Sequence, residues 1–149
     1  MRIEVAGIPA PQGSKRHVGG GRMVEQSRAV GPWREAVRAE TQRAKDLLAV
    51  CCTHPGTGIC MCDCHDNFDA FDGPARVQIT FRLPRPKSAP KSVTLPIKRP
   101  DIDKLARAVL DGLVAGGALA DDSQVVDLLV SKRFATTRPG CIIEITERT

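Results

Sequence analysis

The stretch from Arg99 to Lys132, RPDIDKLARAVLDGLVAGGALADDSQVVDLLVSK, constrains the fold more than any other part of the sequence. Each residue of a helix advances by about 100°. If residues 102–115 are helical, their large apolar side chains fall on one face and their charged side chains on the other. We therefore expect a helix over residues 102–115, then a glycine-rich turn and a strand over residues 125–134. The residues of the apolar face are Ile102, Leu105, Val109 and Leu113.

Two other kinds of spacing predict the rest of the fold. Apolar and polar residues alternate in residues 2–8 and 76–83, which indicates strands, and residues 141–146 are predicted to form a further strand. Residues 32–50 carry an apolar stripe at helical spacing. The order strand, helix, strand, helix, strand, strand predicts one α/β (α+β) domain over residues 1–149. It would have two layers, a four-stranded mixed sheet with both helices on one face and the other face open to a partner.

The charge is unevenly distributed. The chain of 149 residues has a formal net charge of +5 and a pI of about 9.1. Residues 76–107 hold nine Lys or Arg against two Asp, whereas residues 51–75 hold four Asp and no Lys or Arg. This separation favours a surface for a polyanion beside a distinct insertion at residues 51–74. No apolar run approaches the roughly 20 residues of a membrane helix, and the N-terminal residues lack the apolar core of a secretory signal, so we expect a cytoplasmic protein.

Four carboxylates lie at the two ends of the predicted helix–turn–strand unit. Asp101 and Asp103 begin the helix, and Asp121 and Asp122 precede the strand. Carboxylates are the ligands that Mg²⁺ prefers, and an acidic cluster in a basic chain suggests phosphodiester chemistry. Ordinary structural roles are the alternatives: Asp as a helix cap, the Asp pair as a plain turn, and Asp103 with Arg107 as a surface ion pair.

The motifs of this stretch resemble the RusA family of Holliday-junction resolvases. The family has an Asp-x-Asp-Asn-Leu helix, then Asp-Gly/Ala-Leu, then Asp-Asp-x-Gln-Val. The matching segments here are residues 101–105 (DIDKL), 111–113 (DGL) and 121–125 (DDSQV). The N-terminal strand, the basic loop and the helix with Trp33 also fit the family's layout. The resemblance is specific over about thirty residues.

The resemblance implies a homodimeric, Mg²⁺-dependent crossover junction endodeoxyribonuclease that cuts four-way DNA junctions in recombination and repair. It also implies a bacteriophage or prophage origin, which would place the protein in the cytoplasm of a bacterial host. By the family pattern Asp101, Asp103 and Asp122 are the essential acids and Asp121 is their neighbour at the metal. Two positions depart from it: the usual Asn is Lys104, and a position that often holds Lys is Arg107. Arg keeps the positive charge and can bind phosphate through two donors, but it does not release a proton. Lys104 is therefore a second candidate for the catalytic cation.

Other basic residues are candidates for the DNA backbone, where contacts position the nucleic acid without reading its sequence. We expect residues 15–22 to form a basic, flexible loop and the proline-rich residues 84–98 an extended basic one. The candidate DNA-binding residues are Lys15, Arg16, Arg82, Arg85, Lys87, Lys98 and Arg99.

The insertion is rich in soft metal ligands, and a structural Zn²⁺ ion needs four of them. Since no zinc-finger spacing is present, the four ligands stay open, and an oxidation-prone loop without metal is the alternative. The candidates for zinc are Cys51, Cys52, His54, Cys60, Cys62, Cys64 and His65. Cys141 lies in a predicted strand and is expected to pack in the core.

Three functions remain open from the sequence. The first is the junction-cutting endonuclease, the second a DNA-binding protein on the same scaffold with weakened catalysis, and the third a zinc-stabilised module that binds nucleic acid or protein. Cleavage of branched DNA with Mg²⁺ separates the first from the second. Competition between junction and linear nucleic acids identifies the third.

Overall fold

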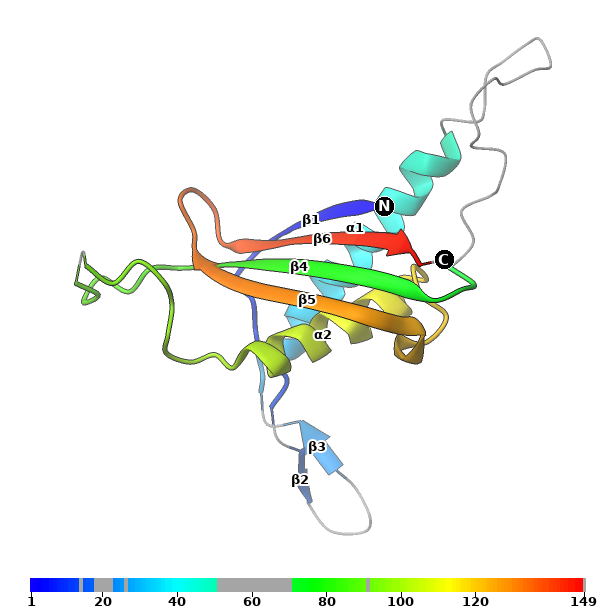
Figure 1. Ribbon diagram of the computed structural model, residues 1–149. Helices are drawn as coiled ribbons and strands as arrows, with labels where there is room; N and C mark the ends of the chain where they lie inside the picture. Colours follow the sequence, from blue (N-terminus) through cyan, green and yellow to red (C-terminus); the bar gives the residue numbers. More distant parts are fainter. Residues whose placement is uncertain (14, 18–22, 26, 51–70, 91, 149) are drawn as a thin grey trace, which may run out of the picture.

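The computed structural model describes residues 1–13, 15–17, 23–25, 27–50, 71–90 and 92–148 (Figure 1). Two long helices and a four-stranded sheet make up most of it. The elements are β1 (Arg2–Ala6), β2 (Lys15–His17), β3 (Met23–Glu25), α1 (Val30–Val50), β4 (Ala75–Leu83), α2 (Ile102–Ala115), the short 3₁₀ helix η1 (Asp122–Gln124), β5 (Val125–Phe134) and β6 (Gly140–Glu147).

The main sheet is mixed, with strand order β1-β6-β4-β5. β6 lies antiparallel between β1 and β4, whereas β5 runs parallel to β4. A parallel pair needs a crossover connection, and α2 provides it. Both helices cover the same face of the sheet, α1 next to β1 and α2 next to β5 (Figure 1). The predicted two-layer α+β domain is therefore confirmed.

The core lies between the sheet and the helices. Alternate residues of β4, among them Val77, Ile79 and Phe81, are fully buried, and they meet Leu105 and Val109 of α2. This is the alternation expected of a strand with one covered face. None of the helices in the described part of the chain is long and apolar enough to span a bilayer.

The two helices approach closely where α2 carries glycine. A Cβ atom at Gly112 would lie 2.7 Å from the Cβ of Val37, and one at Gly116 would lie 2.6 Å from the Cβ of Thr41. No real Cβ tolerates such contacts, so both positions require glycine for this crossing. Arg34 of α1 adds an ion pair with Asp111 of α2, at 2.8 Å between Nη2 and Oδ2.

The N-terminal segment differs from the prediction. Residues 15–22 were expected to form a flexible loop, but β2 pairs with β3, with Lys15 opposite Glu25. Three-residue strands carry too little periodicity to be recognised from sequence. α1 begins at Val30 rather than at Pro32, which still leaves the proline in the first turn, where its missing N–H is not needed.

Candidate active site

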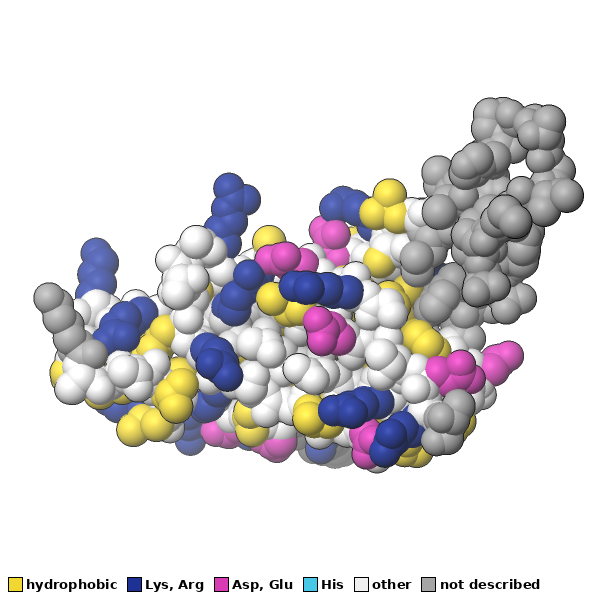
Figure 2. Space-filling view, turned by 45° about the horizontal axis from the view of Figure 1, so that its top comes forward, with side chains coloured by type: hydrophobic (Ala, Val, Ile, Leu, Met, Phe, Trp, Pro, Cys, Tyr) yellow, Lys and Arg dark blue, Asp and Glu magenta, His cyan; other side chains and the backbone are white. Residues whose placement is uncertain are grey.

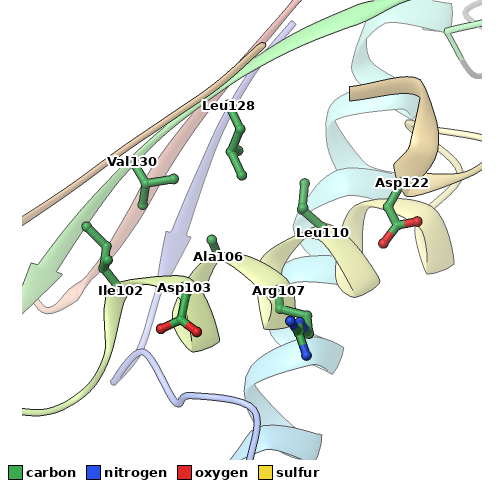
Figure 3. Close-up of a pocket in the computed structure, with 8 residues that line it drawn as sticks. All are labelled: Ile102, Asp103, Ala106, Arg107, Leu110, Asp122, Leu128 and Val130. Atoms are coloured by element: carbon green, nitrogen blue, oxygen red, sulfur yellow. The ribbon is translucent and has the colours of Figure 1, made fainter. Parts of the chain in front are cut away.

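An open pocket lies between α2 and the edge strand β5 (Figure 3). Its volume is about 320 Å³, and most of its wall is apolar. α2 and η1 contribute its charged residues. The lining residues are Ile102, Asp103, Ala106, Arg107, Leu110, Asp122, Leu128 and Val130.

The pocket brings together two of the four predicted acids. Asp103 stands in the first turn of α2, and Asp122 is the first residue of η1, just before β5. Figure 3 shows Arg107 between them, with both carboxylates pointing away from Leu128 and Val130. All three charged side chains are exposed, so a negatively charged ligand and its counter-ion can reach them together.

The turn before β5 explains why Asp122 and not Asp121 reaches the pocket. An Asp121 Oδ1 oxygen accepts a hydrogen bond from the backbone N–H of Ser123 at 2.9 Å, and the Gln124 side chain accepts one from the Asp121 N–H at 3.1 Å. This reciprocal arrangement is a capping box. Hydrogen bonds from Ser123 lower the pKa of Asp121 below its usual value. Asp121 thus holds the turn that presents Asp122, and its place as a metal ligand stays a prediction.

Asp101 lies next to the pocket but does not line it. It is the N-cap residue of α2, and its Oδ2 oxygen is 3.6 Å from Nζ of Lys104. Both side chains are about half exposed, so this ion pair contributes little stability. Lys104 therefore lies against one of the predicted acids. Among the described residues, no three His, Cys, Asp or Glu side chains gather closely enough to hold a metal alone.

Lys132 of β5 is a site residue that sequence reasoning missed. Its Nζ donates hydrogen bonds to the backbone oxygens of Lys98 and Pro100, each at 3.0 Å. These carbonyls stand on either side of Arg99, immediately before Asp101. The ammonium thus fixes the chain where it enters α2. The sequence did carry a signal: Lys132 continues the alternation of Val126, Leu128 and Val130, which places its charge on the face of the strand that α2 covers.

The basic candidates have different surroundings. Arg82 pairs with Glu4 at 2.5 Å on the uncovered face of the sheet, and Arg85 lies 5.0 Å from the ring centre of Phe134. The remaining described candidates, Lys87, Lys98 and Arg99, are exposed. The backbones of Lys15 and Arg16 form β2, while their side chains lie outside the described part.

The uncovered face of the sheet carries both signs of charge. Arg2 pairs with Glu144 and Arg148 with Asp127, as Arg82 does with Glu4. Figure 2 shows positive and negative side chains interspersed over this face, whereas Lys and Arg dominate the end that holds the loop after β4. The positive surface predicted from the sequence therefore lies at the loop.

The predicted zinc ligands, residues 51–65, lie outside the described residues. Cys141, in contrast, is fully buried in β6. Burial raises the pKa of its thiol to about 12. The prediction that Cys141 packs in the core is confirmed.

A comparison with known families agrees with the site. The family described as endodeoxyribonuclease RusA matches residues 59–146, which is more than half of the chain. The match includes α2, η1 and the whole pocket. The chain therefore belongs to the RusA endodeoxyribonuclease family, a family of nucleases. No curated protein matches the sequence.

Proposed function

We propose that this protein is a Mg²⁺-dependent endonuclease that cuts four-way DNA junctions in recombination and repair. The observation that carries the proposal is the pocket in which Asp103 and Asp122 lie on either side of Arg107. Asp103 and Arg107 lie one turn apart on α2, Asp122 comes from η1, and together they combine the two charges that hydrolysis of a phosphodiester needs. Membership of the RusA family supports the class of substrate.

The acids present are suited to Mg²⁺. Proteins usually bind this ion through one or two carboxylates, with water and substrate phosphate completing the shell. Asp103 and Asp122 are exposed at the pocket, and Asp101 lies at the start of the same helix. We propose that Asp103 and Asp122 hold the ion together with the substrate phosphate, while Asp101 and Asp121, which do not line the pocket, lie beside them. When bound, Mg²⁺ would polarise the phosphate and lower the pKa of the attacking water.

The protein's own residues would then orient the reactants. The guanidinium of Arg107 donates to non-bridging oxygens of the scissile phosphate, where negative charge grows as water attacks phosphorus and the ester oxygen departs. Lys104 neutralises Asp101 and is the second candidate for donating to these phosphate oxygens. Apolar Leu110, Leu128 and Val130 line the inner wall of the pocket, behind its charged rim.

Cleavage of an immobile four-way junction tests this function. Wild-type protein should cut the junction with Mg²⁺, and Asp103→Asn should not, while both bind it in Ca²⁺. Asp103 is exposed, so the substitution leaves the fold unchanged. Binding without cleavage by the wild type would favour the alternative of a catalytically weakened DNA-binding protein. A mutant that cuts at the wild-type rate would refute the role of Asp103.

We also propose that the protein acts as a homodimer, joined along β5. This ten-residue strand is an edge of the sheet, and its Val126, Leu128 and Leu129 are 59%, 44% and 43% exposed. A long apolar edge strand readily pairs with another strand. A two-fold pair would place two pockets on a junction that also has two equivalent strands. Leu129→Lys should give monomers in sedimentation, whereas Leu47→Lys, on exposed α1, should not.

For the insertion we propose one structural Zn²⁺ per chain, bound by four of the seven Cys and His residues between 51 and 65. Elemental analysis after dialysis without chelator measures this content. A metal-free, folded and active preparation would refute it.

A further inference from the structure

A second and larger hollow lies beside the active-site pocket. The loop of residues 84–100 forms most of its wall, and the ends of β1, β4 and β5 complete it. We call it the loop hollow. Its volume is about 590 Å³, compared with about 320 Å³ for the active-site pocket. The large apolar side chains that line it are Ile8, Leu83, Val93, Leu95, Ile97 and Phe134.

Three of these side chains are unusually exposed. Ile97 is 82% exposed, Ile8 68% and Leu95 54%. Single exposed apolar residues are ordinary, but a gathered group that lines a concavity marks a binding surface. The apolar lining therefore predicts a ligand with a hydrophobic part.

The charged residues that line the loop hollow are all positive. Residues 73–100 contain no Asp or Glu, and Lys98 and Arg99 belong to the lining itself. Arg85 and Lys87 are exposed on the same loop. An apolar hollow with cations at its rim complements a nucleotide, which has an apolar base and an anionic phosphate.

The loop that lines the hollow is held in place by contacts within the loop and with β5. The Arg85 guanidinium lies over the Phe134 ring at 5.0 Å, and its Nη2 donates to the backbone oxygen of Pro90 at 2.7 Å. Lys132 fixes the opposite end of the loop through Lys98 and Pro100. A hollow held open in this way costs little ordering when a ligand enters.

The position of the loop hollow connects it with cleavage. Figure 1 shows the loop running from the end of β4 back to the start of α2. Arg99 lines the loop hollow and Asp101 follows two residues later, a separation of at most about 7 Å along the chain. A base in the loop hollow would thus belong to a nucleotide close to the cut.

We propose that the loop hollow receives a base that leaves the stack at the branch point of DNA. This inference rests on the proposed function, since it assigns to the same substrate a second contact. Extrusion of a base costs least where its pairing or stacking is already disturbed, and the strands exchange partners at a branch point. Apolar side chains of the loop hollow then replace the lost stacking, while Lys98 and Arg99 hold the adjacent phosphates. The contact selects branched over continuous duplex DNA.

An abasic scan in Ca²⁺, which permits binding without cleavage, tests the inference on the full-length protein. Each nucleotide near the crossover of an immobile four-way junction is replaced singly by an abasic site. Wild-type affinity should fall at least about fivefold at one position, as expected when a stacked base is removed. The double variant Leu95→Ser/Ile97→Ser should bind the intact junction more weakly by a similar factor and be insensitive to the same abasic site.

Leu47→Ser is the matched control, because Leu47 is 67% exposed on α1, outside the loop hollow. It should keep the wild-type response to every abasic site. The inference is overturned if wild-type affinity falls at no position, or if the double variant keeps the full response. Lack of junction cleavage in Mg²⁺ would instead refute the proposed function, which this binding measurement does not use.

Discussion

The two sides of α2 differ in how they are covered. Toward α1 the helix is sealed: Gly112 and Gly116 bring the two backbones together, and no side chain could be added without displacing Val37 or Thr41. Toward β5 the same helix leaves a pocket of about 320 Å³, with Asp103 and Arg107 at its rim. One side is packed to the density of a core and the other is open.

This difference shows how the fold positions the site. The crossing with α1 fixes the rotation of α2 about its axis, since only the glycine stripe can face Val37 and Thr41. That rotation leaves Asp103 and Arg107 at the exposed rim of the pocket, where Asp122 also lies. Changes on the sealed side should therefore act on stability, and changes on the open side on chemistry.

The largest effect is expected for Asp122→Asn, on the open side. The variant should lose cleavage by at least about a thousandfold, because a neutral amide oxygen binds Mg²⁺ more weakly than a carboxylate and the negative charge of the site is lost. Junction binding in Ca²⁺ should persist. Asp121→Asn is the matched control: Asn also caps a helix, so cleavage should stay within about threefold of wild type. Single-turnover kinetics on a four-way junction measure both, and equal losses would contradict the separate roles of the two aspartates.

Arg107→Ala should reduce the cleavage rate by about a hundredfold and weaken binding far less, because it acts on charge that develops in the transition state. Arg107→Lys should keep or raise activity. Lys104→Ala should matter less, since Lys104 is paired with Asp101. The same kinetics rank the three variants. If Lys104→Ala is the most damaging, the charge-stabilising role belongs to Lys104.

Gly112→Ala tests the sealed side. The added methyl would meet Val37 at 2.7 Å, so the free energy of unfolding should fall by about 2 kcal/mol, as for other overpacked sites. Gly31→Ala on α1, where nothing lies within 4 Å, should be neutral or slightly stabilising. Urea denaturation followed by circular dichroism gives both values. Equal stability of the two variants would mean that α1 and α2 are not closely packed at Gly112.

The smallest effect is expected for Lys132→Met, which removes the two hydrogen bonds before Asp101. Lys132 is a positioning residue, so its loss should raise the concentration of Mg²⁺ needed for half-maximal cleavage by about tenfold, as for other groups that orient metal ligands. The melting temperature should change little, whereas junction affinity should fall modestly, because the same two hydrogen bonds hold one end of the loop hollow. An unchanged Mg²⁺ dependence would show that Lys132 supports the loop alone.

The sequence by itself determined the elements that local periodicity encodes. The predicted helix over 102–115 and strand over 125–134 coincide with α2 and β5, and the alternation of residues 76–83 is the burial pattern of β4. These signals are strong because one face of each element is covered. A covered face requires apolar residues at the period of the helix or strand, and that period is visible in the sequence. The acids Asp103 and Asp122 were likewise found by their motifs before any geometry was known.

Only the tertiary structure decided how these elements meet. It separated Asp122 in the pocket from Asp121 in the turn, paired Lys104 with Asp101, and placed Lys132 against the chain before α2. It also formed the loop hollow from three strand ends and a proline-rich loop. Such contacts join segments far apart in sequence, and their geometry depends on the packing of every element between them. The local spacing of apolar and polar residues therefore does not predict these contacts.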